Sequence, residues 1–427
     1  MDYYRHRIMD GLLRKTLQAK GAVLIEGPKW CGKTTTAEEI ASSKIMLARA
    51  DVKNNFKNLL EIDIDIALTG DTPMLIDEWQ TVPKLWDAVR YTVDHRRKMG
   101  QFILTGSAVP DKEAEKEIEH SGTGRFAWLT MRPMSLYESG ESNGKVSLGD
   151  LFSGKEKILE KNELKLPDIA FLICRGGWPM SVGLEREAAL EQAFDYYDAV
   201  TKEDIVRVDG VKRASARVQR LMRAYARHQG TQVSIATLKD DLKNNDISSL
   251  DEDTISSYLD ALRKIFVVED MPAWNPNLRS KTAIRTTDTR YFIDPSIATA
   301  ALGLGPEDLM NDLNTLGLLF ETMCARDLRV FADALHGNVY HYRDKSGLEC
   351  DAVVHLRNGQ YGLVEIKLGG ESLINDGVAT LNSLAAEIDT SRMKAPAFNM
   401  ILTATGEYAY RRPDDGIFIV PIGCLKH

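Results

Sequence analysis

Short apolar runs alternate with polar stretches in the first third of the chain. The runs GAVLIEG (21–27), PMLI (73–76) and QFILTG (101–106) are rich in branched residues. Runs of this kind are typical of strands that are buried on both faces of a parallel sheet. The stretch TTAEEIASS (35–43), after the first run, can form a helix. The pattern therefore predicts an α/β domain with a parallel sheet over residues 1–140.

The pattern becomes less regular in the middle of the chain. From about Gly140 onward Gly, Ser, Asn and Lys are frequent, which predicts an exposed connecting or lid region with a short helix over residues 141–205. Near its end, Gly176, Gly177 and Pro179 predict a tight turn with a structural role.

Residues 206–300 contain three helix-like stretches followed by an apolar run. The first stretch carries apolar residues on one helical face, at Val218, Leu221, Met222 and Tyr225. Three helices and a strand are the plan of a winged helix-turn-helix, a module that can read DNA through its third helix. That helix would begin with Asp251, Glu252 and Asp253, which repel phosphates, whereas basic residues cluster within 207–227 and 279–285. DNA contact and a protein-contacting joint therefore both remain open.

Residues 301–427 combine one helical pattern with two strand-like runs. Apolar residues recur at helical spacing in LGLLFETMCARDLRVFAD (316–333), and LECDAVVHL (348–356) and YGLVEIKL (361–368) flank the hairpin signal RNGQ. This order predicts a helix followed by an antiparallel pair of strands, and hence a second α/β domain.

The composition agrees with a globular protein of several domains. The chain has 427 residues, 44% of them hydrophobic and 27% charged, with a net charge of -8. A basic nucleic-acid surface would therefore have to be local. No apolar run is long enough for a membrane span, and no secretion signal is evident at the start. The five cysteines are widely spaced, which indicates reduced thiols in a cytoplasmic protein.

The segment GPKWCGKT, directly after the first apolar run, matches the phosphate-binding pattern GxxxxGK[ST]. Its position between a predicted strand and a predicted helix is the context that this motif requires. The glycines allow the loop to turn its N–H groups inward, and the helix directs its positive end to the same point. We expect Lys33 to contact the β and γ phosphates of ATP, and Thr34 to bind Mg²⁺. The predicted cofactor-binding set is Gly27, Pro28, Lys29, Trp30, Cys31, Gly32, Lys33, Thr34 and Thr35.

Two adjacent carboxylates follow the second apolar run. Asp77 and Glu78 stand at the end of a predicted strand, about where a parallel sheet presents its ligand edge. Asp77 is predicted to hold the Mg²⁺ through its water shell. Glu78 is predicted to act as the general base that polarises the attacking water.

Three further polar residues are candidates for the same site. Thr105 or Ser107, at the end of the third apolar run, could sense the γ-phosphate, or could simply end a strand. Arg125, in the segment GTGRFAWLTMRPMSLYE, could neutralise charge on the transferring phosphate, from its own chain or from a neighbour. A surface salt bridge is the alternative for Arg125.

The order of these motifs resembles a widespread bacterial and archaeal family of AAA-type P-loop ATPases. The resemblance rests on GPKWCGKTTTAE, LIDEWQ, ILTGSA and GR…MRPMSLYE, and it extends over nearly the whole chain. Members of this family are mostly uncharacterised ATP-binding proteins with a C-terminal domain of unknown function. The resemblance implies ATP or GTP binding, with ATP favoured, and it also implies a winged helix and a GG-x-P element after the ATPase core.

A carboxylate and lysine pattern marks the last third. It consists of Glu321 near the start of the predicted helix, Asp351 in the first strand, and Glu365 and Lys367 in the second. Two carboxylates and a lysine can hold a divalent metal and activate water for phosphodiester cleavage. Glu365 and Lys367 share a strand face. A three-residue loop over 358–360 would pair Asp351 with Lys367 and place all of them on that face, whereas a two-residue loop would not.

This second pattern resembles the PD-(D/E)xK fold of restriction endonucleases, with Glu321 as the carboxylate of its first helix. The main reading is therefore a cytoplasmic ATPase in which nucleotide state controls a winged helix (206–300) and a nuclease-like domain (301–427). The alternatives are an ATP-gated protein-binding module with an inactive nuclease-like domain, and a DNA-binding regulator. The partners implied are ATP with Mg²⁺ and either DNA or another protein, without a membrane; oligomerisation is left open.

Overall fold

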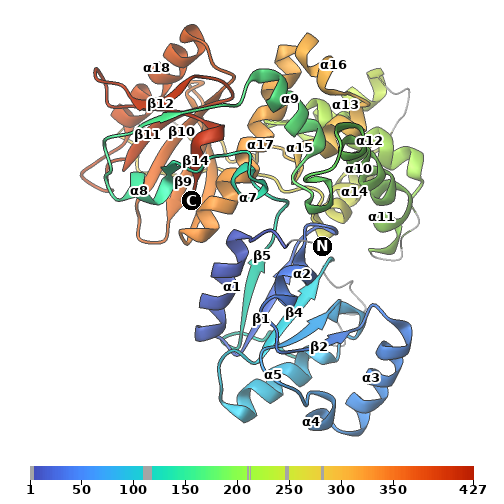
Figure 1. Ribbon diagram of the computed structural model, residues 1–427. Helices are drawn as coiled ribbons and strands as arrows, with labels where there is room; N and C mark the ends of the chain where they lie inside the picture. Colours follow the sequence, from blue (N-terminus) through green and yellow to red (C-terminus); the bar gives the residue numbers. More distant parts are fainter. Residues whose placement is uncertain (1–3, 109–117, 209–210, 212, 246–249, 280–282) are drawn as a thin grey trace. The chain divides into compact units, whose positions relative to one another are not determined.

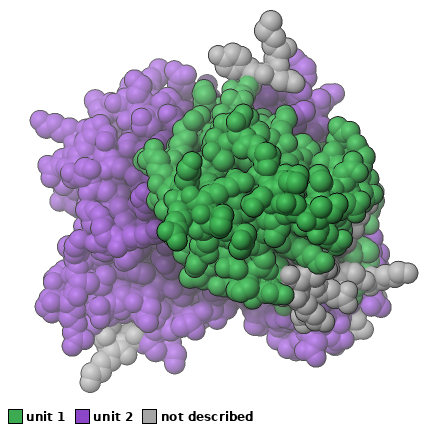
Figure 2. Space-filling model, turned by 90° about the horizontal axis from the view of Figure 1, so that it is seen from below, with its two compact units in different colours: residues 1–133, 202–213, 260–267 green, residues 134–201, 214–259, 268–427 purple. Residues whose placement is uncertain are grey.

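The computed structural model describes residues 4–108, 118–208, 211, 213–245, 250–279 and 283–427. The chain divides into two compact units, coloured separately in Figure 2. Unit 1 contains residues 1–133, 202–213 and 260–267, and unit 2 contains residues 134–201, 214–259 and 268–427. Each unit is therefore built from segments that are distant in sequence. The four-part division by sequence remains a prediction.

Unit 1 contains a five-stranded parallel sheet with the order β2-β3-β4-β1-β5, which can be followed in Figure 1. Its strands are β1 (Ala22–Glu26), β2 (Ser43–Met46), β3 (Met74–Asp77), β4 (Phe102–Gly106) and β5 (Phe126–Thr130). Its helices include α1 (Ile8–Ala19), α2 (Lys33–Glu38), α3 (Ala50–Ile62), α4 (Ile64–Ala67), α5 (Leu85–Arg96) and α11 (Ile205–Arg207). The predicted parallel α/β domain is thus present.

Strand β1, which lies between β4 and β5, is buried on both faces of this sheet, as its apolar run predicts. Val23 and Ile25 belong to a core with α1 and α2. Leu24, on the opposite face, packs in a core with α3 and α5. Alternate residues of a strand point to opposite faces, so a run of apolar residues is required to fill both cores.

Unit 2 contains most of the remaining helices. They are α7 (Leu136–Ser139), α8 (Leu148–Phe152), α9 (Leu166–Arg175), α10 (Arg186–Ala199), α12 (Ser215–Arg227), α13 (Ile235–Asn245), α15 (Pro295–Leu302), α16 (Pro306–Asn311), α17 (Leu313–Ala334) and α18 (Glu371–Glu387), while α14 (Glu252–Lys264) continues into a segment of unit 1. None of the helices that the structure describes is long and apolar enough to cross a membrane. All five cysteines are buried and free of disulfides.

Unit 2 also contains a seven-stranded mixed sheet with the order β7-β12-β13-β11-β10-β9-β8. The strands are β7 (Leu159–Lys161), β8 (Gly337–Arg343), β9 (Glu349–Leu356), β10 (Tyr361–Lys367), β11 (Phe398–Thr403), β12 (Tyr408–Arg411) and β13 (Phe418–Pro421). A separate pair joins β6 (Val146–Ser147) to β14 (Leu425–Lys426). The predicted helix and hairpin of the last third correspond to α17, β9 and β10.

The prediction of an exposed connection with a short helix after Gly140 is correct only in part: residues 153–157 are exposed and α8 is present, but two short strands belong to sheets. Strand β7 forms an edge of the large sheet by pairing with β12, and β6 pairs with β14. Val146, Leu148 and Leu151 are buried. The local sequence gave no sign of these strands because they are only two and three residues long and their partners lie more than 240 residues away.

The three helices predicted in the middle of the chain are present as α12, α13 and α14, but the strand predicted after them is not. Val268 and Met271 form only isolated antiparallel bridges with Phe292 and Thr289. Pro272 has no N–H group, so a continuous ladder cannot pass through it. Lys212 and Lys281 of the predicted basic clusters lie outside the described residues.

A buried ion-pair cluster holds the GGWP turn in unit 2. The Arg326 guanidinium donates to Asp294 at 2.8 Å and to Asp327 at 2.7 Å, and all three side chains are at most 1% exposed. Asp294 also accepts from the Gly177 amide at 3.0 Å. A Cβ on Gly177 would lie 2.2 Å from the Met134 carbonyl oxygen, so only glycine fits there. The structural role predicted for this turn is confirmed.

Arg326→Met is expected to destabilise unit 2 by about 3–5 kcal/mol, because it leaves two buried carboxylates unpaired. Urea unfolding followed by tryptophan fluorescence would measure the loss. Arg125→Met removes an Arg–Asp pair that is exposed, so it should leave the midpoint nearly unchanged. Equal midpoints for the two variants would contradict the importance of the buried cluster.

Candidate functional site

The loop between β1 and α2 has the backbone that the phosphate-binding motif requires. Gly27 has a φ of 150°, and a Cβ there would lie 2.1 Å from the Met131 carbonyl oxygen. Gly32, directly before α2, has a φ of 100°, which favours glycine. Trp30 also has a positive φ, of 65°, and its side chain is 52% exposed. The glycine spacing therefore follows from backbone geometry at both ends of the loop.

Lys33 turns back over this loop and is buried. Its ammonium donates to the carbonyl oxygens of Gly27 at 2.9 Å and Pro28 at 2.7 Å. These two bonds hold a positive charge at the mouth of the loop. Carbonyl oxygens are weaker partners for an ammonium group than phosphate oxygens.

The other members of the predicted loop set differ in exposure. Pro28 and Cys31 are buried, whereas Lys29 and Thr35 are exposed. The Cys31 thiol contacts the Met131 carbonyl oxygen at 3.4 Å. Lys29 forms an ion pair with Asp204, from the segment 202–213 of the same unit. The loop is thus tied to a part of unit 1 that lies far along the chain.

Thr34 and Asp77 meet at the carboxyl end of the parallel strands. The Thr34 hydroxyl donates to Asp77 Oδ1 at 2.7 Å. Thr105, which is fully buried, donates to the same oxygen at 2.7 Å. Strand register places Asp77 directly beside Thr105. The two predicted Mg²⁺ ligands are therefore in contact, and Thr105 orients the carboxylate of Asp77.

Glu78 is held in an unusual backbone conformation next to Asp77. Its φ of 56° lies in the left-handed region, which costs energy for a residue with a side chain. The Ser107 hydroxyl donates to Glu78 Oε2 at 3.0 Å, and the Gln80 amide donates to the same oxygen. Two donors thus fix one oxygen of this carboxylate. Sequence reasoning missed Gln80, although it stands two residues after Glu78 in the same motif.

Arg7 supports the loop from behind and was also missed. Its guanidinium donates to the carbonyl oxygens of Cys31 at 2.7 Å and Arg132 at 2.8 Å, and it is buried. It precedes α1, where no motif marked it. Its contacts join the loop to the chain just after β5.

The assignment of Arg125 to this site in its own chain is wrong. Arg125 directly precedes β5, and its carbonyl oxygen accepts from the Ala22 amide at the start of β1. The phosphate loop follows the other end of β1, about 13 Å away along the strand. The guanidinium instead pairs with Asp94 at 2.8 and 3.0 Å on the surface. The alternative of a surface salt bridge is the observed one, and action on a neighbouring chain stays a prediction.

The second predicted cluster, Glu321, Asp351, Glu365 and Lys367, lies in unit 2. Its lysine forms ion pairs with two of its carboxylates. The Lys367 ammonium donates to Glu365 at 2.6 Å and to Asp351 at 3.2 Å. The Glu321 carboxylate accepts from the Tyr291 hydroxyl. No group of three His, Cys, Asp or Glu side chains that could hold a metal ion occurs among the described residues. The second metal site stays a prediction.

Strand register explains why three members of this cluster share a face. β9 and β10 pair Val353 with Leu363 and Ala352 with Val364, so Asp351 stands opposite Glu365. The predicted pairing of Asp351 with Lys367 is wrong by two residues. The odd-length loop is nevertheless present, over Arg357–Gly359, because the Leu356 amide donates to Gln360.

Burial and neighbouring charges shift the pKa values of the side chains in this cluster. Desolvation and the Asp351 carboxylate raise the pKa of Glu365 to about 8, and desolvation raises the pKa of Glu321 well above its usual value. Burial opposes the charge of Lys367, but the two carboxylates outweigh it and raise its pKa. Glu365 Oε1 is buried and has no hydrogen bond with any described residue.

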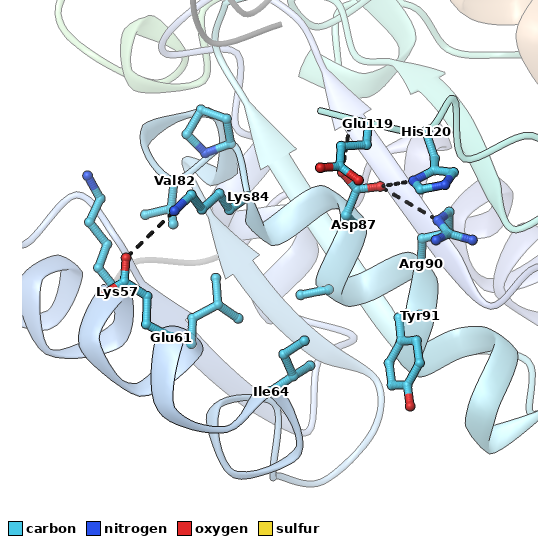
Figure 3. Close-up of a pocket in the computed structure, with 13 residues that line it drawn as sticks. Lys57, Glu61, Ile64, Val82, Lys84, Asp87, Arg90, Tyr91, Glu119 and His120 are labelled. Carbon is cyan, nitrogen blue, oxygen red and sulfur yellow. Dashed lines mark hydrogen bonds and ion pairs between the residues drawn. The ribbon is translucent and has the colours of Figure 1, made fainter. Parts of the chain in front are cut away.

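A cavity of about 640 Å³ lies in unit 1 but not at the phosphate loop. Figure 3 shows its lining from α3, α4 and α5. Some of its charges pair with one another: Lys84 with Glu61 at 3.7 Å, and Asp87 with His120 at 2.9 Å. Cavity volume therefore does not identify the phosphate site, because the phosphate loop does not line this cavity.

Family models match three parts of the chain. Residues 19–140 match the model described as an AAA domain. Residues 166–308 and 316–425 match two models that are each described as a domain of unknown function, DUF8612 and DUF4143.

Two curated relatives align with most of the chain. They are the uncharacterized proteins Rv2008c of Mycobacterium tuberculosis and Mb2031c of Mycobacterium bovis. Each is 26% identical over 358 residues, which cover 83% of this chain and 72% of the relative.

Two solved structures are also similar. A Walker-type ATPase of Pyrococcus abyssi is 12% identical with a TM-score of 0.40, over 70% of this chain and 96% of that one. The RuvB Holliday junction branch migration motor of Thermotoga maritima is 15% identical with a TM-score of 0.23, over 61% of this chain and 89% of that one.

Proposed function

We propose that this protein binds ATP with Mg²⁺ at the loop Gly27–Gly32 and hydrolyses it slowly, as a switch for the rest of the chain. The observation that carries the proposal is the convergence of Thr34, Asp77 and Glu78 at the carboxyl ends of β1 and β3, beside the loop that Lys33 caps. Hydroxyl and carboxylate oxygens are the ligands that Mg²⁺ prefers.

Each side chain then has a distinct role. The loop amides and Lys33 would hold the β and γ phosphates, after Lys33 leaves the two carbonyl oxygens. Thr34 and Asp77 would hold Mg²⁺, which supplies neutralising charge to the phosphates when bound. Glu78, oriented by Ser107 and Gln80, would accept a proton from water. Measurement of ATP binding and phosphate release by the full chain, with variants at Lys33 and Glu78, separates these steps.

The ion pair between Lys29 and Asp204 supports a switching role. Lys29 lies within the phosphate loop, and Asp204 precedes the segment that leads into α12. A bound γ-phosphate would compete with Asp204 for Lys29. The nucleotide state would thereby change how the loop is held to residues 202–213. This mechanism needs neither a threading loop nor a motor.

The middle segment is proposed to be a winged-helix module that contacts protein. Arg217, Arg220 and Arg223 are exposed along α12, but α14 begins with the exposed acids Glu252 and Asp253. A recognition helix with this start would repel DNA phosphates. A protein contact therefore accounts better for the charges than base readout by α14.

The C-terminal sheet is proposed to be a nuclease-like domain that binds a partner and does not cleave nucleic acid. Lys367 occupies the position between Asp351 and Glu365 that a metal would need. Cleavage is the second candidate, because the unpartnered Glu365 Oε1 is the type of atom that binds a metal ion.

The expected result is no cleavage of single- or double-stranded DNA or RNA by the full chain with Mg²⁺ or Mn²⁺, with and without ATP. The matched control is the double variant Glu365→Ala, Lys367→Ala. Cleavage by the unmodified chain that this variant lacks would contradict the closed cluster, and would make the protein an ATP-regulated nuclease.

A further inference from the structure

A second cavity in unit 1, of about 230 Å³, has walls of tryptophan. It lies on the α5 side of the parallel sheet and is lined by Trp79, Trp86 and Trp128. The ring centroids of Trp79 and Trp86 are 5.0 Å apart, and those of Trp86 and Trp128 are 6.0 Å apart. Phe126 stacks on Trp86 with its centroid at 3.9 Å. We call this cavity the tryptophan pocket.

Among the described residues, one carboxylate of the tryptophan pocket has no counter-charge. Glu26, the last residue of β1, lines the pocket and is partly buried. Within the described part of the chain, its side chain makes no hydrogen bond or ion pair. Burial raises the pKa of Glu26 above its usual range. A carboxylate removed from water without a partner costs free energy, which a cation would recover.

The neighbouring larger cavity differs in its carboxylates. Glu61 and Asp87 have cationic partners, as the dashed lines in Figure 3 mark, and the third carboxylate, Glu119, is exposed to solvent. His120 lines both cavities, but its Nδ1 lies 2.9 Å from Asp87, so its hydrogen bond is directed there. Ser121 is the remaining polar side chain of the tryptophan pocket and carries no charge. Glu26 is thus the charged group that the pocket offers to a ligand.

We propose that the tryptophan pocket binds an organic monocation, with a quaternary ammonium or guanidinium head, against Glu26. An aromatic face within about 6 Å attracts such a cation, and tryptophan attracts it most strongly. Trp128, which is 49% exposed, is the accessible tryptophan of the pocket, because Trp79 and Trp86 are only 4% and 5% exposed. The carboxylate supplies the opposite charge, and the volume suits a head group or an arginine side chain. A free small molecule and an arginine of another protein share this chemistry.

Titration of the nucleotide-free full chain with choline and with agmatine tests the proposal. The readout is tryptophan fluorescence, and the neutral tert-butyl analogue of choline is the matched ligand. Both cations should change the emission saturably, whereas the neutral analogue should not. Tighter choline binding would identify a free ammonium ligand, and tighter agmatine binding a guanidinium. Equal binding of the neutral analogue would overturn the proposal. Because no nucleotide is present, this result is independent of ATP binding.

Variants locate the binding. Glu26→Gln should weaken choline binding about ten-fold or more, and Trp128→Leu about five-fold, since each removes one attraction to the cation. Trp128 is 49% exposed, so its variant should fold even if Glu26→Gln does not. Glu61→Gln, which removes a paired carboxylate of the neighbouring cavity, should bind as the unmodified chain does. Unchanged affinity in both the Glu26 and Trp128 variants would overturn the assignment.

A lysine of the chain itself is the competing occupant. Residues 109–117, outside the described part, include Lys112 and Lys116. The double variant Lys112→Met, Lys116→Met should bind choline as tightly as the unmodified chain. Binding that occurs only in this double variant would show that the pocket holds an internal lysine, and would overturn the proposal of an external ligand.

Discussion

Lys33→Ala is expected to weaken MgATP binding by more than about 100-fold, because it removes two or more charge-assisted hydrogen bonds to phosphate. The structure adds a reason beyond the motif. The ammonium of Lys33 is already held at the mouth of the loop by the carbonyl oxygens of Gly27 and Pro28. Isothermal calorimetry with a slowly hydrolysed ATP analogue would measure the change.

The matched control for this variant is Lys20→Ala. Lys20 lies just before β1, at the opposite end of that strand, and its ammonium contacts only the Gly124 carbonyl oxygen at 3.3 Å among the described residues. Both variants remove one positive charge from the same unit, so a general electrostatic effect would appear in both. Retained affinity in Lys33→Ala, with normal circular dichroism, would refute the assignment of the loop to phosphate binding.

Glu78→Gln is expected to retain ATP binding and to lower the hydrolysis rate by about 10²–10⁴-fold, the usual contribution of a general base. Glutamine keeps the size of the side chain, and its carbonyl oxygen can still accept from Ser107 and Gln80. What is lost is the ability to accept a proton from water. Phosphate release under single-turnover conditions would measure the rate, beside calorimetry for binding.

Glu38→Gln is the control for Glu78→Gln. Glu38 lies at the end of α2 in the same unit, and its exposed side chain pairs with Lys44 at 2.8 Å. Its variant should hydrolyse ATP at the unmodified rate. If turnover were the same in Glu78→Gln and Glu38→Gln, another residue would have to activate the water.

Local patterns were sufficient to predict the elements that carry the phosphate site. β1, β3 and β4 were visible because strands buried on both faces must be continuously apolar, and their polar ends mark the ligand edge. The contact of Asp77 with Thr34 and Thr105 follows from that edge. Whether Thr105 or Ser107 senses the γ-phosphate stays a prediction, since each now has a carboxylate partner.

The features that sequence reasoning missed depend on distant or directional contacts. Arg7 donates to backbone carbonyl oxygens. Every residue has such an oxygen, so the sequence does not show which ones Arg7 contacts. Arg125 precedes β5, so it lies at the amino end of that strand. The phosphate loop lies at the carboxyl ends of the parallel strands. Strand direction alone was therefore enough to show that Arg125 is at the opposite edge of the sheet. The register of β9 and β10 depends on where the three-residue loop begins: it covers 357–359 and not 358–360, and a hairpin signal does not specify that position.

The pairing of β7 with β12 and of β6 with β14 has a consequence for the order in which the protein can fold during synthesis. All five strands of the unit 1 sheet lie before residue 131, so that sheet can assemble while the ribosome is still translating unit 2. Residues 146–161, by contrast, must wait for partners at 408–411 and 425–426. For most of translation these edge segments therefore have unpaired backbone groups, which can pair with another chain.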